Sequence, residues 1–451
     1  MMQFFRIAIR NLIKNRTRTL IVGGAITGVT MLMAVLMGII SGIEQTMISN
    51  ATAMMSGHVN VAGFFKISQS SAAPLVTKTP ELYKMVRETL PEADYVIDRV
   101  KAFGKLISDT TTIQVPLWGV DYEMEKRMLG RLALAHKRDY IKDYKPAAGD
   151  TGYEGSFAGL KERGTVVMFS AHARKLGVRV GDTVTISMFT QRNQSNTKDV
   201  RVAAVLANLG IMSSFNVFMN KEDARELYQM SEDTTGQLMI YLKDARQNAA
   251  AEELLRKAAS ARGWKLMEKD PQAFWMKFDR VAGESWTGQR LDITTWQDET
   301  SFLKWIIDIF HVLTFIMITV LMVIVMLGLM NTLWMSIRER TSEIGTLRAI
   351  GLQKRGVMIM FMLESMALSV ASALAGTVLG SLLNRGLDAI GIPINSEAFQ
   401  MFLMSNRLRV IIEPGDMLLT FCMITVFLTI GALYPSWKAG KMKPITAINQ
   451  V

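Results

Sequence analysis

Four long apolar segments place this chain among the membrane proteins. Residues 19–43 contain no charged side chain, and residues 305–337, 357–384 and 417–437 are mainly apolar. Each segment reaches or exceeds the ~20 residues that a helix needs to cross ~30 Å of hydrocarbon. A cleaved signal peptide is the alternative for the first segment. That segment is longer than a usual signal core, however, so we expect four membrane-spanning helices.

Basic residues near the ends of these segments predict the orientation. Residues 1–18 carry five basic side chains and no acid, and the connector 338–356 and the tail 438–451 are also basic. The connection 385–416 mixes both signs and is expected outside. Both termini are therefore predicted in the cytoplasm, with residues 44–304 on the far side, in the periplasm of a Gram-negative cell. The net charge of +11 is attributed to these flanks and not to nucleic-acid binding.

The large segment 44–304 has the pattern of a mixed α/β domain. Residues 165–169, 170–176 and 183–189 predict the order strand, helix, turn, strand, and residues 238–242, 245–261 and 264–268 predict strand, helix, strand. Because Cys422, the single cysteine, lies in the fourth span, this domain must fold without disulfides. The fold class is therefore four transmembrane helices plus a mixed α/β domain between helices 1 and 2.

Residues 1–18 are predicted to form an amphipathic helix on the inner leaflet. Phe5, Ile9 and Leu12 recur at helical spacing, while Arg6 and Arg10 follow the opposite face.

Small and acidic residues inside the spans predict contacts between helices. Gly24 and Gly28, and likewise Gly376 and Gly380, stand four residues apart and allow close helix packing or a dimer contact. Glu364 is expected to pair with a basic residue at the cytoplasmic interface.

The connector has a distinctive sequence. Residues 338–351 read Arg-Glu-Arg-Thr-Ser-Glu-Ile-Gly-Thr-Leu-Arg-Ala-Ile-Gly, and residues 434–439 near the end read Tyr-Pro-Ser-Trp-Lys-Ala. Both stretches resemble the FtsX/MacB-like permeases of ABC transporters, the mechanotransmission type (type VII). The layout is most similar to that of the lipoprotein-release (LolC/LolE-like) permeases. The tail differs from the family pattern, since Ile448 and Asn449 stand where relatives commonly have leucine and then an acidic residue.

The resemblance implies a role for the connector and a plan for the outer domain. The connector would be the coupling helix that docks on an ATPase, with charges setting its register and apolar residues supplying contact. The residues expected there are Arg338, Arg340, Glu343, Ile344, Leu347, Arg348 and Ile350. The domain 44–304 would be porter-like α/β, with a variable β-rich subdomain at about residues 120–235, and residues 1–18 would be an elbow helix.

No catalytic motif is present in these 451 residues. There is no G-x-x-x-x-G-K-[ST] phosphate loop, no H-E-x-x-H, no G-x-S-x-G and no paired-cysteine metal site. The chain is therefore expected to be a non-catalytic subunit without its own cofactor or metal, and the ATP and Mg would be used by a separate ATPase.

The resemblance also implies partners and a function. The expected partners are two ATPase copies, a second identical or related permease subunit, membrane lipids, and a lipoprotein substrate or periplasmic adaptor. The expected function is extraction or release of lipoprotein or lipid from the bacterial inner membrane. Two alternatives stay open: efflux of hydrophobic compounds or peptides with an adaptor, and FtsX-like regulation of a periplasmic cell-wall hydrolase.

Overall fold

A computed structural model describes residues 10–14, 16–69, 72–190, 194–210, 213, 216–394, 400, 403, 405 and 407–442. The chain divides into two compact units. The helical unit comprises the described residues up to Gln45, Ile307–Pro393 and those from Arg407 onward; the α/β unit comprises Thr46–Ile306 and the described residues of 394–406. Most of the predicted elbow helix 1–18, and the tail motif beyond residue 442, lie outside the described residues.

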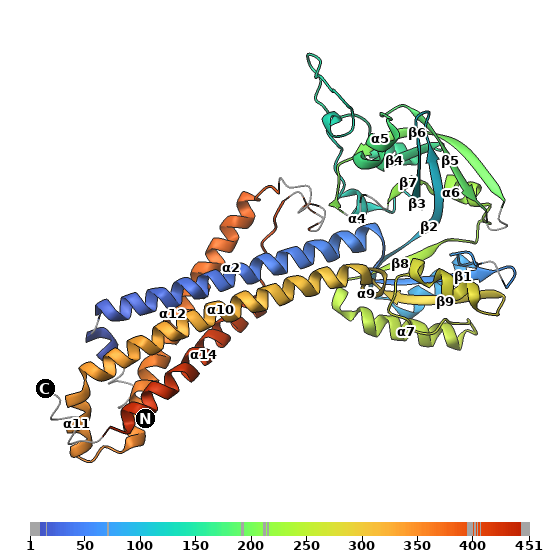
Figure 1. The fold of residues 1–451 in the computed structure, drawn as a ribbon. Helices are drawn as coiled ribbons and strands as arrows, with labels where there is room; N and C mark the ends of the chain where they lie inside the picture. The colour runs from blue at the N-terminus through green and yellow to red at the C-terminus, as the bar shows by residue number, and fades with distance from the viewer. Residues whose placement is uncertain are drawn as a thin grey trace. The chain divides into compact units, whose positions relative to one another are not determined.

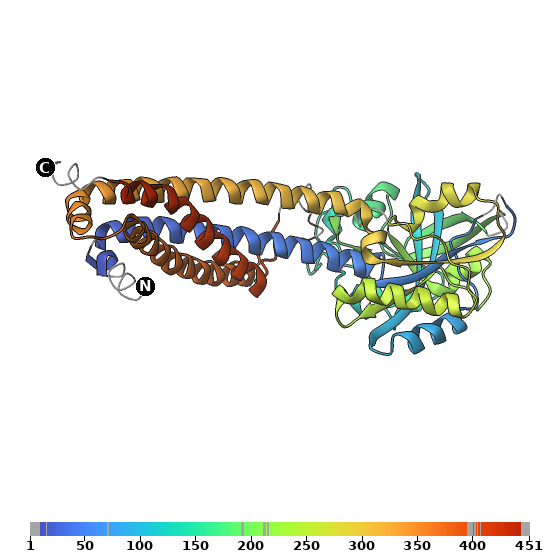
Figure 2. The same ribbon diagram turned by 90° about the horizontal axis from the view of Figure 1, so that it is seen from below.

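Among the described residues, the helical unit contains four long helices and a short helix between two of them, besides a short helical stretch at residues 10–14 (Figures 1 and 2). The long helices are α2 (Arg16–Met54), α10 (Ser301–Glu339), α12 (Lys354–Ile390) and α14 (Pro414–Gly440), and the short one is α11 (Thr341–Ala349). Within the described ranges, these four long helices are long and apolar enough to cross a membrane. All four contribute to one core, exemplified by Ile26, Leu329, Ala373 and Leu428. Their outward surfaces are also apolar, as lipid-facing helices require.

Helices α2 and α10 extend past the predicted spans 19–43 and 305–337. The last residues of α2, 46–54, and the first residues of α10, 301–306, belong to the α/β unit. Apolar composition marks where a helix can be surrounded by lipid, whereas the backbone hydrogen bonds continue as long as the next residues favour a helix.

The first part of the α/β unit is an antiparallel layer of four strands covered by two helices. The elements are β1 (Val59–Lys66), α3 (Thr79–Thr89), the first part of β2 (Ala93–Ile107), β8 (Gln237–Leu242), α7 (Asn248–Ala261) and β9 (Gly288–Thr295). The strand order β2-β8-β1-β9 is that of a split β-α-β motif. Leu82, Val86 and Leu255 of the helices pack on Val61 and Ile240 of the sheet. This layer, called the antiparallel layer below, agrees with the mixed α/β class.

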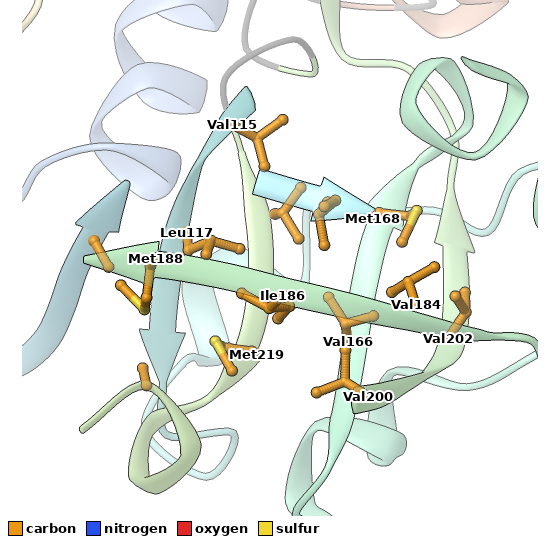
Figure 3. Close-up of a cluster of buried hydrophobic side chains, with 14 of the residues drawn as sticks. Val115, Leu117, Val166, Met168, Val184, Ile186, Met188, Val200, Val202 and Met219 are labelled. Carbon is orange, nitrogen blue, oxygen red and sulfur yellow. The ribbon is translucent and has the colours of Figure 1, made fainter. Parts of the chain in front are cut away.

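The second part is a closed barrel inserted between β2 and β8. It consists of the second part of β2 together with β3 (Thr112–Val120), β4 (Thr165–Phe169), β5 (Thr183–Phe189), β6 (Ser195–Leu206) and β7 (Val217–Asn220). The ring runs β2-β3-β7-β4-β6-β5 and returns to β2. Alternate residues point inward, as Val184, Ile186 and Met188 do on β5, and fill the centre (Figure 3). Helix α5 (Ser170–Leu176) connects the barrel strands β4 and β5, and α6 (Lys221–Tyr228) leads from β7 of the barrel to β8 of the antiparallel layer.

The predicted strand, helix and strand at 165–169, 170–176 and 183–189 are confirmed as β4, α5 and β5. The strand predicted at 264–268 is wrong. That segment makes an isolated bridge between Leu266 and Leu291 and does not continue as a strand. The strands of the barrel also begin before residue 120, the expected start of the β-rich subdomain, because β2 and β3 close the ring.

Candidate coupling site

The connector between α10 and α12 folds as the short helix α11 between two bends. At its start, the Thr341 hydroxyl donates to the Ile337 carbonyl at 3.0 Å and lies 2.8 Å from the Arg338 carbonyl. At its end, Gly351 has a φ of +110°, a backbone conformation that glycine adopts readily and other residues rarely adopt. The Leu352 N–H donates to the Leu347 carbonyl at 3.0 Å. These bonds fix the direction of α11 relative to the flanking helices.

The inner face of α11 packs into the helical unit through Ile344. This side chain is 1% exposed and belongs to a cluster with Ile337, Val357 and Phe361. Its side chain thus fills the core beneath the connector and anchors α11 from within, and a contact of Ile344 with a partner stays a prediction.

The outer face of α11 is exposed and partly apolar. Glu343 is exposed, Leu347 is 41% exposed, and Ile350, the residue after the helix, is 81% exposed. Arg338 is also exposed, just before the helix. We call Glu343, Leu347 and Ile350 the outer stripe. An exposed leucine and isoleucine beside a carboxylate are suited to an apolar contact with a charged rim.

Ion pairs lie behind the connector. Arg340 Nη1 is 3.3 Å from Glu364 Oε2, which confirms the predicted pairing of Glu364 with a basic residue. Arg18 Nη1 of α2 lies 3.6 Å from Glu339 Oε2 at the end of α10. The second pair was missed from the sequence, although opposite charges beside two spans with the same orientation are a usable signal. Arg340 is thus held inside the unit and is less available to a partner than predicted.

Arg348 is also held within the helical unit. Its guanidinium donates to the carbonyl of Met442, near the C-terminal end of the described residues. Of the seven residues predicted to dock, Arg338 and the outer stripe remain on the surface, while Ile344, Arg340 and Arg348 attach the connector to its own unit.

The predicted glycine pairs have different surroundings. A Cβ placed on Gly376 would lie 2.6 Å from the Thr27 carbonyl oxygen, and one on Gly380 would lie 2.7 Å from Ala34 Cβ, so this side of α12 lies against α2. Around Gly24 and Gly28 there is no described atom within 4 Å of such a Cβ. Contact of a second subunit with Gly24 and Gly28 stays a prediction.

Among the residues that the structure describes, no group of three or more His, Cys, Asp and Glu side chains could hold a metal ion.

The fold defines a membrane protein with a large α/β domain between its first two long helices. Residues 19–258 match the MacB-like periplasmic core domain, and residues 315–444 match the FtsX-like permease C-terminal domain. The first of these matches alone covers more than half of the chain. The chain belongs to the family of FtsX-like permeases with a MacB-like periplasmic core domain.

Individual relatives match parts of the chain. The macrolide export ATP-binding/permease protein MacB of Bdellovibrio bacteriovorus is 30% identical over 125 residues, 27% of this chain and 17% of the relative. The lipoprotein-releasing system transmembrane protein LolC of Neisseria meningitidis is 24% identical over 237 residues, 51% of this chain and 49% of the relative. The chain thus spans less than half the length of either relative.

A solved structure of the periplasmic region of MacB from Actinobacillus actinomycetemcomitans is 11% identical, with a TM-score of 0.31 over 56% of this chain and 95% of that one. At this TM-score the likeness adds nothing to the family assignment.

Proposed function

We propose that this chain is a non-catalytic membrane subunit of an ABC transporter. A separate ATPase, present in two copies, uses ATP and Mg, and a second permease subunit, identical or related, completes the assembly. In this proposal the chain lies in the bacterial inner membrane, α11 and both termini face the cytoplasm, and the α/β unit faces the periplasm.

The outer stripe is the observation that carries the proposal. Leu347 and Ile350 expose apolar surface on the connector, and the family assignment makes an ATPase the natural partner for that surface. Ile344 and the Arg340–Glu364 pair hold α11 against the helical unit, so a force on the outer stripe would reach α10 and α12.

For the substrate, we propose lipoprotein or lipid that is taken from the inner membrane. The match to a lipoprotein-releasing protein covers 51% of this chain, whereas the match to a macrolide exporter covers 27%. Efflux with a periplasmic adaptor, and regulation of a cell-wall hydrolase, are the competing outcomes.

The test is to purify the tagged chain from its native membrane in mild detergent and to identify stoichiometric partners and bound lipids by mass spectrometry. An ATPase together with lipoprotein or acyl chains supports the proposal. An ATPase together with an adaptor would instead support efflux, and an ATPase together with a hydrolase would support regulation of that hydrolase. Absence of any ATPase refutes the transporter itself.

The same purification on Ile350→Glu examines the outer stripe. This variant should lose the ATPase because it places a second carboxylate beside Glu343 on an apolar contact. Leu254→Glu is the matched control, since it adds the same charge at an exposed leucine of α7 and should retain the ATPase.

A further inference from the structure

The C-terminal end of α2 is held by side chains of the α/β unit. The last carbonyls of a helix lack partners within the helix and must find them elsewhere. Here the donors come from β2 and β8. The Tyr241 hydroxyl donates to the Thr52 carbonyl at 3.1 Å, Arg99 donates to Ala53 at 2.8 Å and Met54 at 2.6 Å, and the Gln237 amide donates to Met55 at 3.2 Å.

Arg99 is the centre of this arrangement. Its side chain is fully buried, and its guanidinium also donates to the Glu125 carboxylate, through Nε at 2.5 Å and Nη2 at 2.6 Å. Glu125 is 2% exposed. A single planar fork thus joins the end of α2 to an acidic residue that follows β3 in the barrel.

The position of Arg99 in β2 connects the two parts of the α/β unit. Arg99 is paired with Gln237 of β8 in the antiparallel layer, whereas the next residue, Val100, is paired with Gly119 of β3 in the barrel. Arg99 therefore lies at the point where β2 leaves the layer and enters the barrel. We call Arg99, Glu125, Gln237 and Tyr241 the α2 socket.

Stability does not explain the Arg99–Glu125 pair. Removing two charges from water costs several kcal/mol per ion, and a well-packed apolar pair in the same volume is often as stable or more stable. A helix end that needed only capping could also use water or a shorter polar side chain. The socket instead gives α2 a connection to both parts of the α/β unit, beyond its short backbone link to β1.

We propose that the α2 socket is the joint through which a movement of α2 shifts the barrel relative to the antiparallel layer. This inference rests on the proposed function, because the movement would come from the ATPase. A displacement of the α2 end pulls on Arg99, and Arg99 passes it to Glu125 on the barrel side. Gln237 and Tyr241 hold the same helix end on the layer side. Arg99 is in these terms a positioning residue.

The test uses the full chain with its co-purified ATPase in lipid nanodiscs. Spin labels are placed at Thr197→Cys on β6 and Ala250→Cys on α7, both exposed, with the single native cysteine changed by Cys422→Ala. The distance between the labels is measured by double electron–electron resonance without nucleotide and with ATP and vanadate.

The socket variant is Arg99→Met with Glu125→Met, which removes both charges together and leaves no unpaired ion. The matched control is Lys277→Met with Asp292→Met, another fully buried pair of the α/β unit, at 2.8 Å, in which neither residue belongs to α2 or to the α2 socket. A milder variant, Gln237→Leu with Tyr241→Phe, keeps the Arg99–Glu125 pair and removes two of the donors, in case the socket variant fails to fold.

We expect the unsubstituted protein and the control to show an ATP-dependent change in the distance distribution. The socket variant should lose most of that change while its ATPase remains bound and hydrolyses ATP, and the milder variant should lose part of it. An unchanged shift in the socket variant, or in the milder variant where only that one folds, overturns the inference and leaves the proposed function intact. No shift in the unsubstituted protein with an active ATPase bound also overturns the inference. Absence of any bound ATPase refutes the proposed function and the inference with it.

Discussion

Two isoleucines of the connector should respond in opposite ways to the same substitution. Ile344 is 1% exposed in the core beneath α11, and Ile350 is 81% exposed on the outer stripe. If the outer stripe binds the ATPase, Ile350→Ala weakens binding and leaves stability unchanged. Ile344→Ala does the reverse, because it removes buried carbon atoms from the unit itself.

The magnitudes follow from burial. Truncating Ile350 removes three carbon groups worth about 0.8 kcal/mol each when buried, and scaling by its exposed fraction leaves about 2 kcal/mol for the contact. Since 1.4 kcal/mol is tenfold in affinity, the Kd for the ATPase should rise roughly 25-fold. Ile344→Ala should lower the free energy of unfolding by about 2–5 kcal/mol through lost burial and the cavity left behind.

The assay measures both quantities on the same detergent-solubilised samples. Affinity for the purified ATPase is obtained by surface-immobilised titration, and stability by the midpoint of thermal unfolding. The reasoning is refuted if Ile350→Ala lowers the midpoint as much as Ile344→Ala does, or if it binds the ATPase with unchanged affinity.

Three further outcomes are expected. Glu343→Lys should weaken ATPase binding about tenfold at low ionic strength and less at high salt, as a rim charge does; equal loss at all salt concentrations would contradict a charge effect. Gly380→Val should lower the midpoint of thermal unfolding by overpacking α12 on α2, at a cost of about 1–3 kcal/mol, whereas Gly24→Val should leave it unchanged and alter only dissociation of a dimer. Burial lowers the pKa of Lys101 to about 8 from 10.5, so between these values the unfolded state binds more protons and stability rises with pH. Lys101→Met should therefore raise the free energy of unfolding by about 3 kcal/mol at pH 7 and by little at pH 10.5, and a gain that does not depend on pH would point to packing alone.

Local pattern predicted several elements well. The segment from β4 to β5 was found from sequence because an apolar strand, a short helix and a turn at Gly181 follow one another without interruption. The same reasoning from local pattern predicted a strand at residues 264–268, and that prediction is wrong. Their residue pattern suits a strand, but the edge of β9 pairs with this segment only around Leu291, and local pattern does not report such pairing.

Closure of the barrel depends on pairs that are distant in the sequence. Leu117 on β3 is paired with Val217 on β7, and Thr165 on β4 with Arg201 on β6, both in parallel register. A parallel pair has no short hairpin that could reveal it locally. The family resemblance therefore implied a β-rich subdomain, whereas the local sequence pattern could not predict the order of its strands.

The exposure of the connector was only partly predictable. A helix turns about 100° per residue, so Ile344 and Ile350 lie about 120° apart around the helix axis and cannot belong to one narrow face. Helical spacing alone could have separated them, although it could not have identified which face meets the core. The Arg99–Glu125 pair was missed because its partners are distant in sequence, and because the Asp-Arg-Val-Lys stretch at residues 98–101 of β2 looks like a solvated charged segment and gives no sign that the arginine is buried.

Strand β2 has a practical consequence for dissecting this protein. The barrel is inserted in the middle of a strand and not in a loop, so residues 100–107 complete the ring while residues 93–99 complete the layer. A fragment cut to isolate either part must therefore divide one continuous strand and leave an open sheet edge that is prone to aggregation. Swapping barrels between relatives should work only when the exchanged piece begins inside β2, at the residue where its hydrogen-bonding partner changes.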